Sequence, residues 1–244
     1  NEYPTIFLTF KDVDGLNFQA AKGMLWSQIA NLYNEHNYLA MSEKVNENDR
    51  KIFKKIADLA EGNPSDNLLK TSILTLMRMM EAYYGKKVIV IIDEWDVLIR
   101  DGEVSETIQD EYINFLRGMF KGTEPTKYIQ LAYLTGILPI KKIKDESALN
   151  NFSEYTMLKS SPITKYYGFT EDEVTGLCKR FDMDFDSTKA WYNGYLIDGI
   201  HMYNPNSVSM AVERNDFDSY WRNTSSFASI NTFIMMNYAG LKDD

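Results

Sequence analysis

A run of five β-branched residues that ends in two carboxylates constrains this chain more than any other feature. Residues 88–92 read Val-Ile-Val-Ile-Ile, and Asp93 and Glu94 follow directly. An unbroken apolar run of this length is typical of a strand that is buried on both faces of a parallel sheet. In open α/β sheets, ligands gather at the carboxyl ends of the strands. The run therefore predicts a buried strand with a candidate site at its tip.

Two interpretations of the acidic tip remain open on this stretch alone. In enzymes that hydrolyse ATP or GTP, the first acid at such a tip holds Mg²⁺, and a second acid beside it can take a proton from the attacking water. The alternative is a buried strand that is followed by an ordinary acidic turn. If the strand continued, Asp93 and Glu94 would point to opposite sides. Asp96 would then serve to cap the following turn.

Composition narrows the class of protein. The chain has 244 residues, of which 44% are hydrophobic, enough for one large domain or two small ones. Its net charge of −9 argues against broad electrostatic docking on nucleic acid or an anionic membrane. No apolar run approaches the ~20 residues that span a bilayer. We expect a cytoplasmic protein without a membrane partner.

The single cysteine, Cys178, excludes an internal disulfide framework and suits a reducing compartment. Leu177 lies beside it and Val174 lies one helical turn before it, so a buried structural thiol is expected. Because the chain has only His36 and His201 besides, a metal site of the Cys and His type is not supported.

Apolar spacing along the first two thirds of the chain alternates between strand and helix. Strand patterns cover residues 3–10, 88–92 and 128–135, with a weaker one at 155–158, and helical patterns lie between them. Strands separated by long helices predict an α/β fold with a parallel sheet flanked by helices. We assign this core to residues 1–159.

The pattern changes after Ser160. Thr170 and Glu173 form a capping-box motif ahead of a helical run. Asn193-Gly194 and Asn204-Pro205 interrupt the helical patterns that follow, and no further strand is predicted. We therefore expect residues 160–244 to form a helical subdomain.

Other polar residues offer weaker candidates. Thr135 ends a strand, and its hydroxyl would lie beside the acidic tip if the two strands are neighbours, although a threonine at a strand terminus needs no function. Asn150 and Asn151 would orient a phosphate or, more simply, shape a turn. Aromatic turns at 191–195 and 203–208 would stack on nucleic-acid bases or pack structurally. Few basic residues accompany them, which favours packing.

A phosphate-binding loop is absent from the sequence. The pattern G-x-x-x-x-G-K-[ST], which cradles phosphates in ATPases, occurs nowhere, and Gly85-Lys86-Lys87 lacks both the earlier glycine and the Ser or Thr. The chain also begins at Asn1 without a methionine, and a strand pattern starts at once. We expect a segment of a longer protein.

The order of short motifs along the chain is more specific than any one motif. The motifs lie at residues 3–4, 90–96, 134–136, 149–152, 168–174, 191–195, 203–208 and 220–224. In this order they resemble the AAA-ATPase-like family of bacterial proteins, whose members often carry a C-terminal PD-(D/E)XK nuclease-like domain. One departure is Trp95, where the family usually has Tyr.

The resemblance implies a P-loop ATPase core followed by a helical region, with ATP and Mg²⁺ as cofactors. It implies that Asp93 is the Mg²⁺-associated acid, Glu94 the catalytic base and Thr135 a polar sensor of the γ-phosphate. It also implies that the phosphate loop and its strand lie upstream of this chain, next to the strand that ends at Thr135. The nuclease-like domain would lie beyond Asp244.

Two functions follow as hypotheses. In the first, the full-length protein hydrolyses ATP to drive or gate an attached effector, while this chain alone is inactive and binds no ATP tightly. In the second, the chain is a catalytically inactive module that recognises a protein or nucleic-acid partner. An intact phosphate loop just before Asn1 would favour the first, and a degraded one the second.

The resemblance also fixes an expected topology. The strands around Ile6, Ile89 and Leu131 should form one contiguous parallel sheet, with the Ile89 strand central. The Leu131 strand would then have an unpaired edge, which is a liability for association. We expect residues 155–158, a rearranged part of the chain or another copy of the protein to cover it.

Overall fold

The computed structural model describes residues 2–13, 18–58, 65–100, 106–138, 149, 151–156 and 160–220. The chain divides into two compact units, Asn1–Glu154 and Tyr155–Asp244, whereas the sequence placed the boundary after residue 159. No helix among the described residues has the length and apolar character to cross a bilayer. The two units are described separately.

The first unit is built on a parallel three-stranded sheet. Strands β1 (Thr5–Thr9), β2 (Val88–Asp93) and β3 (Ile129–Leu134) lie in the order β1-β2-β3. Both pairings are parallel, and the register joins Phe7 to Ile91 and Ile91 to Tyr133. The predicted topology, with the Ile89 strand central, is confirmed. Within the described residues β3 pairs only with β2, and residues 157–158 of the 155–158 segment expected to cover its edge lie outside them.

Among the described residues, seven helical segments complete the first unit. In chain order they are α1 (Phe18–Glu35), the 3-10 helix η1 (Asn37–Met41), α2 (Glu47–Ala57), α3 (Asp66–Tyr84), α4 (Val97–Arg100), α5 (Glu106–Phe120) and α6 (Thr123–Tyr128). Helix α3 begins where the Ser65 side chain accepts a hydrogen bond from the Leu68 N–H, and it ends at Gly85, whose φ of 65° is left-handed.

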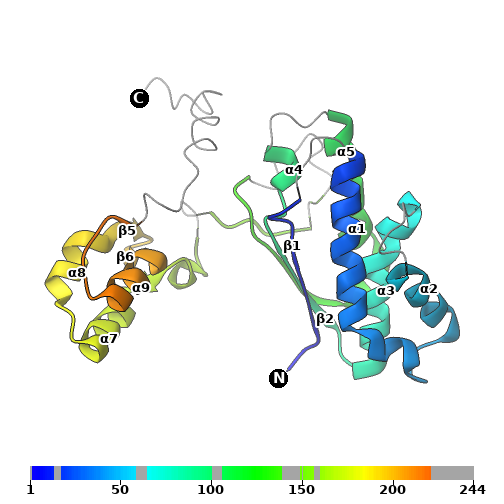
Figure 1. Cartoon of the computed structure of the whole chain (residues 1–244), viewed down its shortest axis with the longest axis horizontal. Coiled ribbons are helices and arrows are strands. Elements are labelled where there is room, and N and C mark those ends of the chain that lie inside the picture. Colours follow the sequence, from blue (N-terminus) through cyan, green and yellow to red (C-terminus); the bar gives the residue numbers. More distant parts are fainter. Residues whose placement is uncertain are drawn as a thin grey trace. The chain divides into compact units, whose positions relative to one another are not determined.

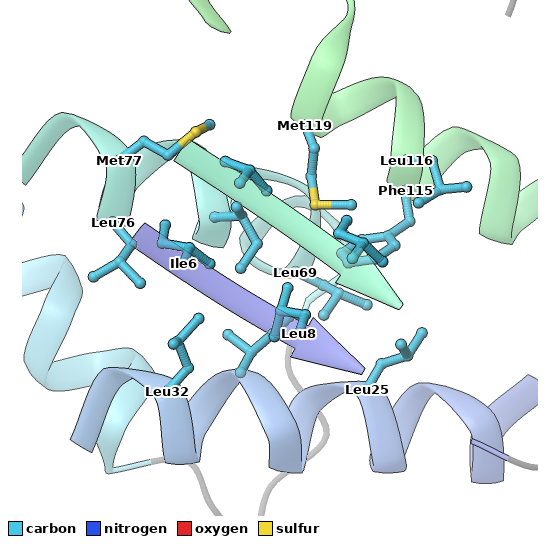
Figure 2. Close-up of a cluster of buried hydrophobic side chains, with 14 of the residues drawn as sticks. Ile6, Leu8, Leu25, Leu32, Leu69, Leu76, Met77, Phe115, Leu116 and Met119 are labelled. Atoms are coloured by element: carbon cyan, nitrogen blue, oxygen red, sulfur yellow. The ribbon is translucent and has the colours of Figure 1, made fainter. Parts of the chain in front are cut away.

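One face of the sheet makes the core of the first unit. Ile6 and Leu8 of β1 and Val88, Val90 and Ile92 of β2 are buried there. Side chains from helices α1, α3 and α5 converge on this face (Figure 2): Leu25 and Leu32, then Leu69, Leu76 and Met77, then Phe115, Leu116 and Met119. Period-2 alternation in the strands and 3.6-residue spacing in the helices supply these apolar surfaces.

The opposite face of the sheet, which we call the outer face, is apolar but exposed. It carries Phe7, Ile91 and Tyr133 in one row and Ile89 and Leu131 in the next. Phe7 is 57% exposed, Leu131 54% and Tyr133 48%. In the first unit, α1 and α3 lie on the other side of the strands (Figure 1). The prediction that residues 88–92 are buried on both faces is therefore wrong for the described structure, because Ile89 and Ile91 face this partly exposed surface.

The second unit is not purely helical. It contains η3 (Thr164–Tyr166), α7 (Glu171–Phe181), α8 (Phe185–Tyr192) and α9 (Pro205–Arg214). It also contains strands β4 (Phe169–Thr170), β5 (Asn193–Ile197) and β6 (Ile200–Tyr203), which form an antiparallel sheet in the order β4-β6-β5. The expectation of no strand after residue 160 was wrong.

The position of the hairpin turn explains why the strands β5 and β6 were not predicted from the sequence. Asn193-Gly194 was interpreted as a turn, but these residues begin β5. The chain reverses instead at Asp198 and Gly199, which both have positive φ, 49° and 77°. This is the Asp-Gly pairing that two-residue hairpins favour. With strands of two to five residues, the apolar alternation is too short to stand out in the sequence.

Aromatic and small side chains make the core of the second unit. One cluster of buried side chains contains Val174, Cys178, Tyr192, Tyr203, Val208, Ala211 and Tyr220. The burial of Cys178 is confirmed, as is the capping box of Thr170 and Glu173 at the start of α7. Tyr192 and Tyr203 pack as expected, while Trp191 lies 53% exposed.

The two faces of the sheet predict losses of different size for the same truncation. Leu76→Ala, on α3 against the core face, should lower the free energy of unfolding by about 3 kcal/mol, because it leaves a cavity. Leu131→Ala on the outer face should cost less than about 1 kcal/mol, since the side chain is already half in water. Urea denaturation followed by far-UV circular dichroism measures both. Equal losses would show that the outer face is covered in solution.

Candidate functional site

The candidate site lies where the three parallel strands end. Strand β2 ends at Asp93, and the next residue, Glu94, has a φ of 56°. This left-handed conformation costs a residue with a Cβ roughly 1–2 kcal/mol. The strand therefore does not continue through Glu94, and the Val97 N–H donates to the Glu94 carbonyl 3.2 Å away to begin the turn into α4. Such local strain often marks functional loops.

Asp93 lies between two threonine hydroxyls. The Thr135 hydroxyl donates to Asp93 Oδ1 at 2.6 Å, and the Thr9 hydroxyl donates to Asp93 Oδ2 at 3.4 Å. Thr9 is the last residue of β1, Thr135 follows β3, and all three residues are partly buried. The sequence analysis correctly predicted that Thr135 would lie beside Asp93 if their strands were neighbours. It missed Thr9, which the parallel register places directly beside Asp93.

Glu94 lies in the turn that follows Asp93. Its side chain is half-buried, and its Oε2 atom is shielded from solvent. Because the chain turns at this residue, its carboxylate does not follow the strand alternation that set the sequence expectation. It nevertheless stays one peptide away from Asp93, at the same end of the sheet.

The Asp96 side chain binds the loop after β3, a contact that the sequence did not indicate. It is completely buried, and its Oδ2 atom accepts hydrogen bonds from the backbone N–H groups of Ile137 and Leu138, at 2.8 and 2.6 Å. These two bonds join Asp96 to the loop after β3, whereas the sequence suggested a cap on the turn that follows it. In that turn the Ile99 N–H bonds instead to the main-chain carbonyl of Asp96, at 2.9 Å.

Two further contacts fix the loop after β2. A Cβ atom placed on Gly136 would lie 2.6 Å from Trp95 Nε1 and 2.7 Å from Asp96 Oδ1, so any larger residue there would displace these side chains. On the other side, the buried Tyr112 hydroxyl of α5 donates to the Trp95 carbonyl. Burial, together with the nearby Asp96 carboxylate, raises the pKa of Tyr112 well above its usual value, so this hydroxyl stays protonated.

The oxygen atoms of the site fit a magnesium ion better than a softer metal. Asp93 offers a carboxylate, and Thr9 and Thr135 offer hydroxyls, which are all hard ligands. Within the described part of the chain, no group of three His, Cys, Asp or Glu residues is placed to hold a metal ion. Magnesium in nucleotide enzymes commonly has one or two carboxylates, with phosphates and water as its other ligands.

Of the two paired asparagines, Asn151 lies within the described residues and makes a main-chain contact. Asn150 lies outside the described residues. Asn151 donates from Nδ2 to the Phe120 carbonyl at 3.2 Å, which ties its loop to the end of α5. This contact agrees with a structural role for Asn151.

Comparison with known proteins decides the family. Residues 1–144 match the family model described as "Predicted AAA-ATPase". The chain belongs to this family. The match covers more than half of the chain and includes all three strands of the parallel sheet, Asp93, Glu94 and Thr135. The resemblance stated from the sequence is therefore confirmed as to family, and the described α/β fold is consistent with a P-loop-like domain.

A curated relative gives no activity to compare. The chain is 29% identical over 154 residues to a protein of Azotobacter chroococcum mcd 1 described as "Uncharacterized protein in vnfD 5'region". The alignment takes in 62% of this chain and 30% of the relative. The chain thus spans less than a third of the length of that protein. No solved structure gave a significant match.

The two threonines predict unequal contributions to stability. Thr135→Val should lower the free energy of unfolding by about 1.5 kcal/mol, because it removes a short hydrogen bond to a charged carboxylate. Thr9→Val should cost less than about 0.5 kcal/mol, since its hydrogen bond is at the limit of useful length. Chemical denaturation of the two nearly isosteric variants tests this order, and a larger loss for Thr9→Val would contradict it.

Proposed function

We propose that this chain is the acid-bearing and sensor-bearing part of an ATPase. The single observation that supports this most is Asp93, a carboxylate at the tip of the central parallel strand, flanked by threonine hydroxyls from both neighbouring strands. Ligands of open α/β sheets bind at this end, and the family described as predicted AAA-ATPase is named for this activity.

Each side chain would have a distinct role in hydrolysis. Asp93 would hold Mg²⁺, and the ion would neutralise charge on the phosphates. Glu94 would accept the proton of the attacking water. Thr135, whose hydroxyl lies 2.6 Å from Asp93 Oδ1, would sense the γ-phosphate from beside the metal ligand.

The phosphate cradle does not belong to this chain. The printed sequence contains no G-x-x-x-x-G-K-[ST] segment, so its residues do not supply the backbone N–H groups and lysine that bind phosphates. ATPases of this type place the strand before that loop next to the strand that ends at Thr135. In the described structure β3 pairs only with β2, and this agrees with a neighbour supplied by the full-length protein.

The activity would then serve a larger protein. The chain spans 30% of its Azotobacter relative, and we propose that ATP turnover in the full-length protein drives or gates an attached effector. The one cysteine in the sequence supports a cytoplasmic setting.

The outer face favours a second candidate function, a binding module without hydrolysis. Phe7, Leu131 and Tyr133 expose an apolar surface of the kind that marks interaction sites. In this alternative the site residues persist without a working phosphate loop, and the exposed edge of β3 or the face beside it recognises a protein partner or a second copy of the chain.

Substitution of Glu94 in the full-length protein tests the first function. Glu94→Gln should lower ATP turnover by about 10²–10⁴-fold while sparing nucleotide binding, because the amide keeps the size of the side chain but cannot accept the proton. Asp93→Ala should instead weaken the dependence of turnover on Mg²⁺. Glu47→Gln, an exposed carboxylate on α2, is the matched control. Unchanged turnover in Glu94→Gln would remove Glu94 from the base role.

The isolated chain should behave differently from the full-length protein. Calorimetric titration of the 244-residue chain with Mg-ATP should show no binding at micromolar concentration, because the chain lacks the phosphate cradle and its adjacent acids repel a triphosphate. Tight, Mg²⁺-dependent binding would overturn the assignment of the cradle to another part of the protein.

A further inference from the structure

The loops that follow β2 and β3 are joined by Asp96. One oxygen of its carboxylate accepts from the N–H groups of both Ile137 and Leu138, at 2.8 and 2.6 Å. The same loops also meet at their main chains, where the Trp95 N–H donates to the Thr135 carbonyl at 3.0 Å. Gly136 fills the space between these contacts, against Trp95 and Asp96.

The burial of Asp96 makes this connection rigid. Its exposed fraction is 0%, and a buried carboxylate is stable only where hydrogen bonds replace its lost water. Any movement of residues 137–138 away from the loop after β2 would take two hydrogen bonds from this buried carboxylate. The energetic cost of that movement holds the two loops in one arrangement.

We propose that Asp96 is a positioning residue of the ATPase site. It holds the loop that follows Thr135 against the loop that begins with Glu94, and so keeps the Thr135 hydroxyl at Asp93. The inference rests on the proposed function as far as turnover is concerned, whereas the bonds from Ile137 and Leu138 to Asp96 are a property of the structure itself.

The geometry shows how the effect reaches the reacting groups. The Thr135 main chain is bonded on both sides, its N–H to the Ile92 carbonyl at 2.9 Å and its carbonyl to the Trp95 N–H at 3.0 Å. Asp96 fixes the next residues of the same loop, two and three positions on. Loss of that carboxylate frees the loop beyond Thr135, and a displacement of 1 Å in a site can lower a rate by about 10²-fold.

Four variants separate positioning from general loss of stability. Asp96→Ala removes the acceptor, while Asp96→Asn keeps one oxygen in nearly the same place and should act more mildly. Gly136→Ala attacks the same contact from the other loop, because its Cβ would lie 2.7 Å from Asp96 Oδ1. Asp49→Asn is the control, since Asp49 is a buried carboxylate that pairs with Arg78 between α2 and α3, away from the strand tips.

The first measurement is turnover in the full-length protein. Asp96→Ala and Gly136→Ala should lower kcat by about 10-fold or more, with the KM for ATP nearly unchanged, because the phosphate cradle lies elsewhere. Asp96→Asn should recover part of the loss. Asp49→Asn should stay near wild type at a matched reduction in Tm. If Asp49→Asn lowers kcat as much as Asp96→Ala, the positioning role is overturned.

The second measurement does not depend on activity. In the same protein with labelled threonine methyl groups, Asp93→Asn should shift the NMR signal of Thr135 through their hydrogen bond. In an Asp96→Ala background that shift should fall by about half or more, because Thr135 and Asp93 no longer hold a fixed distance. An Asp49→Asn background should leave it intact.

The turnover and NMR measurements test the proposed function and the positioning role independently of each other. A full-length protein without ATPase activity would refute the proposed function, and the NMR result would then decide the positioning role alone. If the Thr135 shift is equally large with and without Asp96, the proposal is wrong whatever the activity. If Asp96→Ala does not fold, Asp96→Asn and Gly136→Ala carry both measurements.

Discussion

The parallel pairing of β2 with both β1 and β3 is the interaction on which the first unit depends. It buries Val88, Val90 and Ile92 under the helices, and it brings the ends of three strands to one edge. Thr9 lies 84 positions before Asp93 in the chain and Thr135 lies 42 positions after it, yet the hydroxyls of both reach the Asp93 carboxylate. The same strand register therefore builds both the apolar core and the candidate site.

The site is held more firmly than its position on loops would suggest. Glu94 turns the chain through a left-handed conformation, which is stable only if the surroundings fix it. Tyr112 holds the Trp95 carbonyl from α5, and Asp96 holds the loop after β3. These supports come from three separate segments, so the acidic tip and Thr135 form one framework. This arrangement suits a site that must present fixed groups to a metal and a phosphate.

The sheet is two-sided in its chemistry. Its inner face is an ordinary apolar core, whereas its outer face carries Phe7, Ile91 and Tyr133 in a row that leads along the strands toward Thr9, Asp93 and Thr135. Both candidate functions use this surface. In an ATPase it lies beside the groups proposed to act on phosphate, and in a binding module it is the surface that a partner covers.

The sequence by itself determined the α/β class, the strand at residues 88–92, the capping box at Thr170, and the candidates Asp93, Glu94 and Thr135. These follow from local patterns, since apolar periodicity and capping chemistry act within a few residues. The central place of that strand was expected from the family resemblance. Only the tertiary structure decided the roles of Thr9, Asp96 and Gly136, the exposed outer face and the small sheet around the Asp198-Gly199 turn. Those features depend on contacts between distant segments and on which surfaces are covered, and neither leaves a periodic trace in the chain.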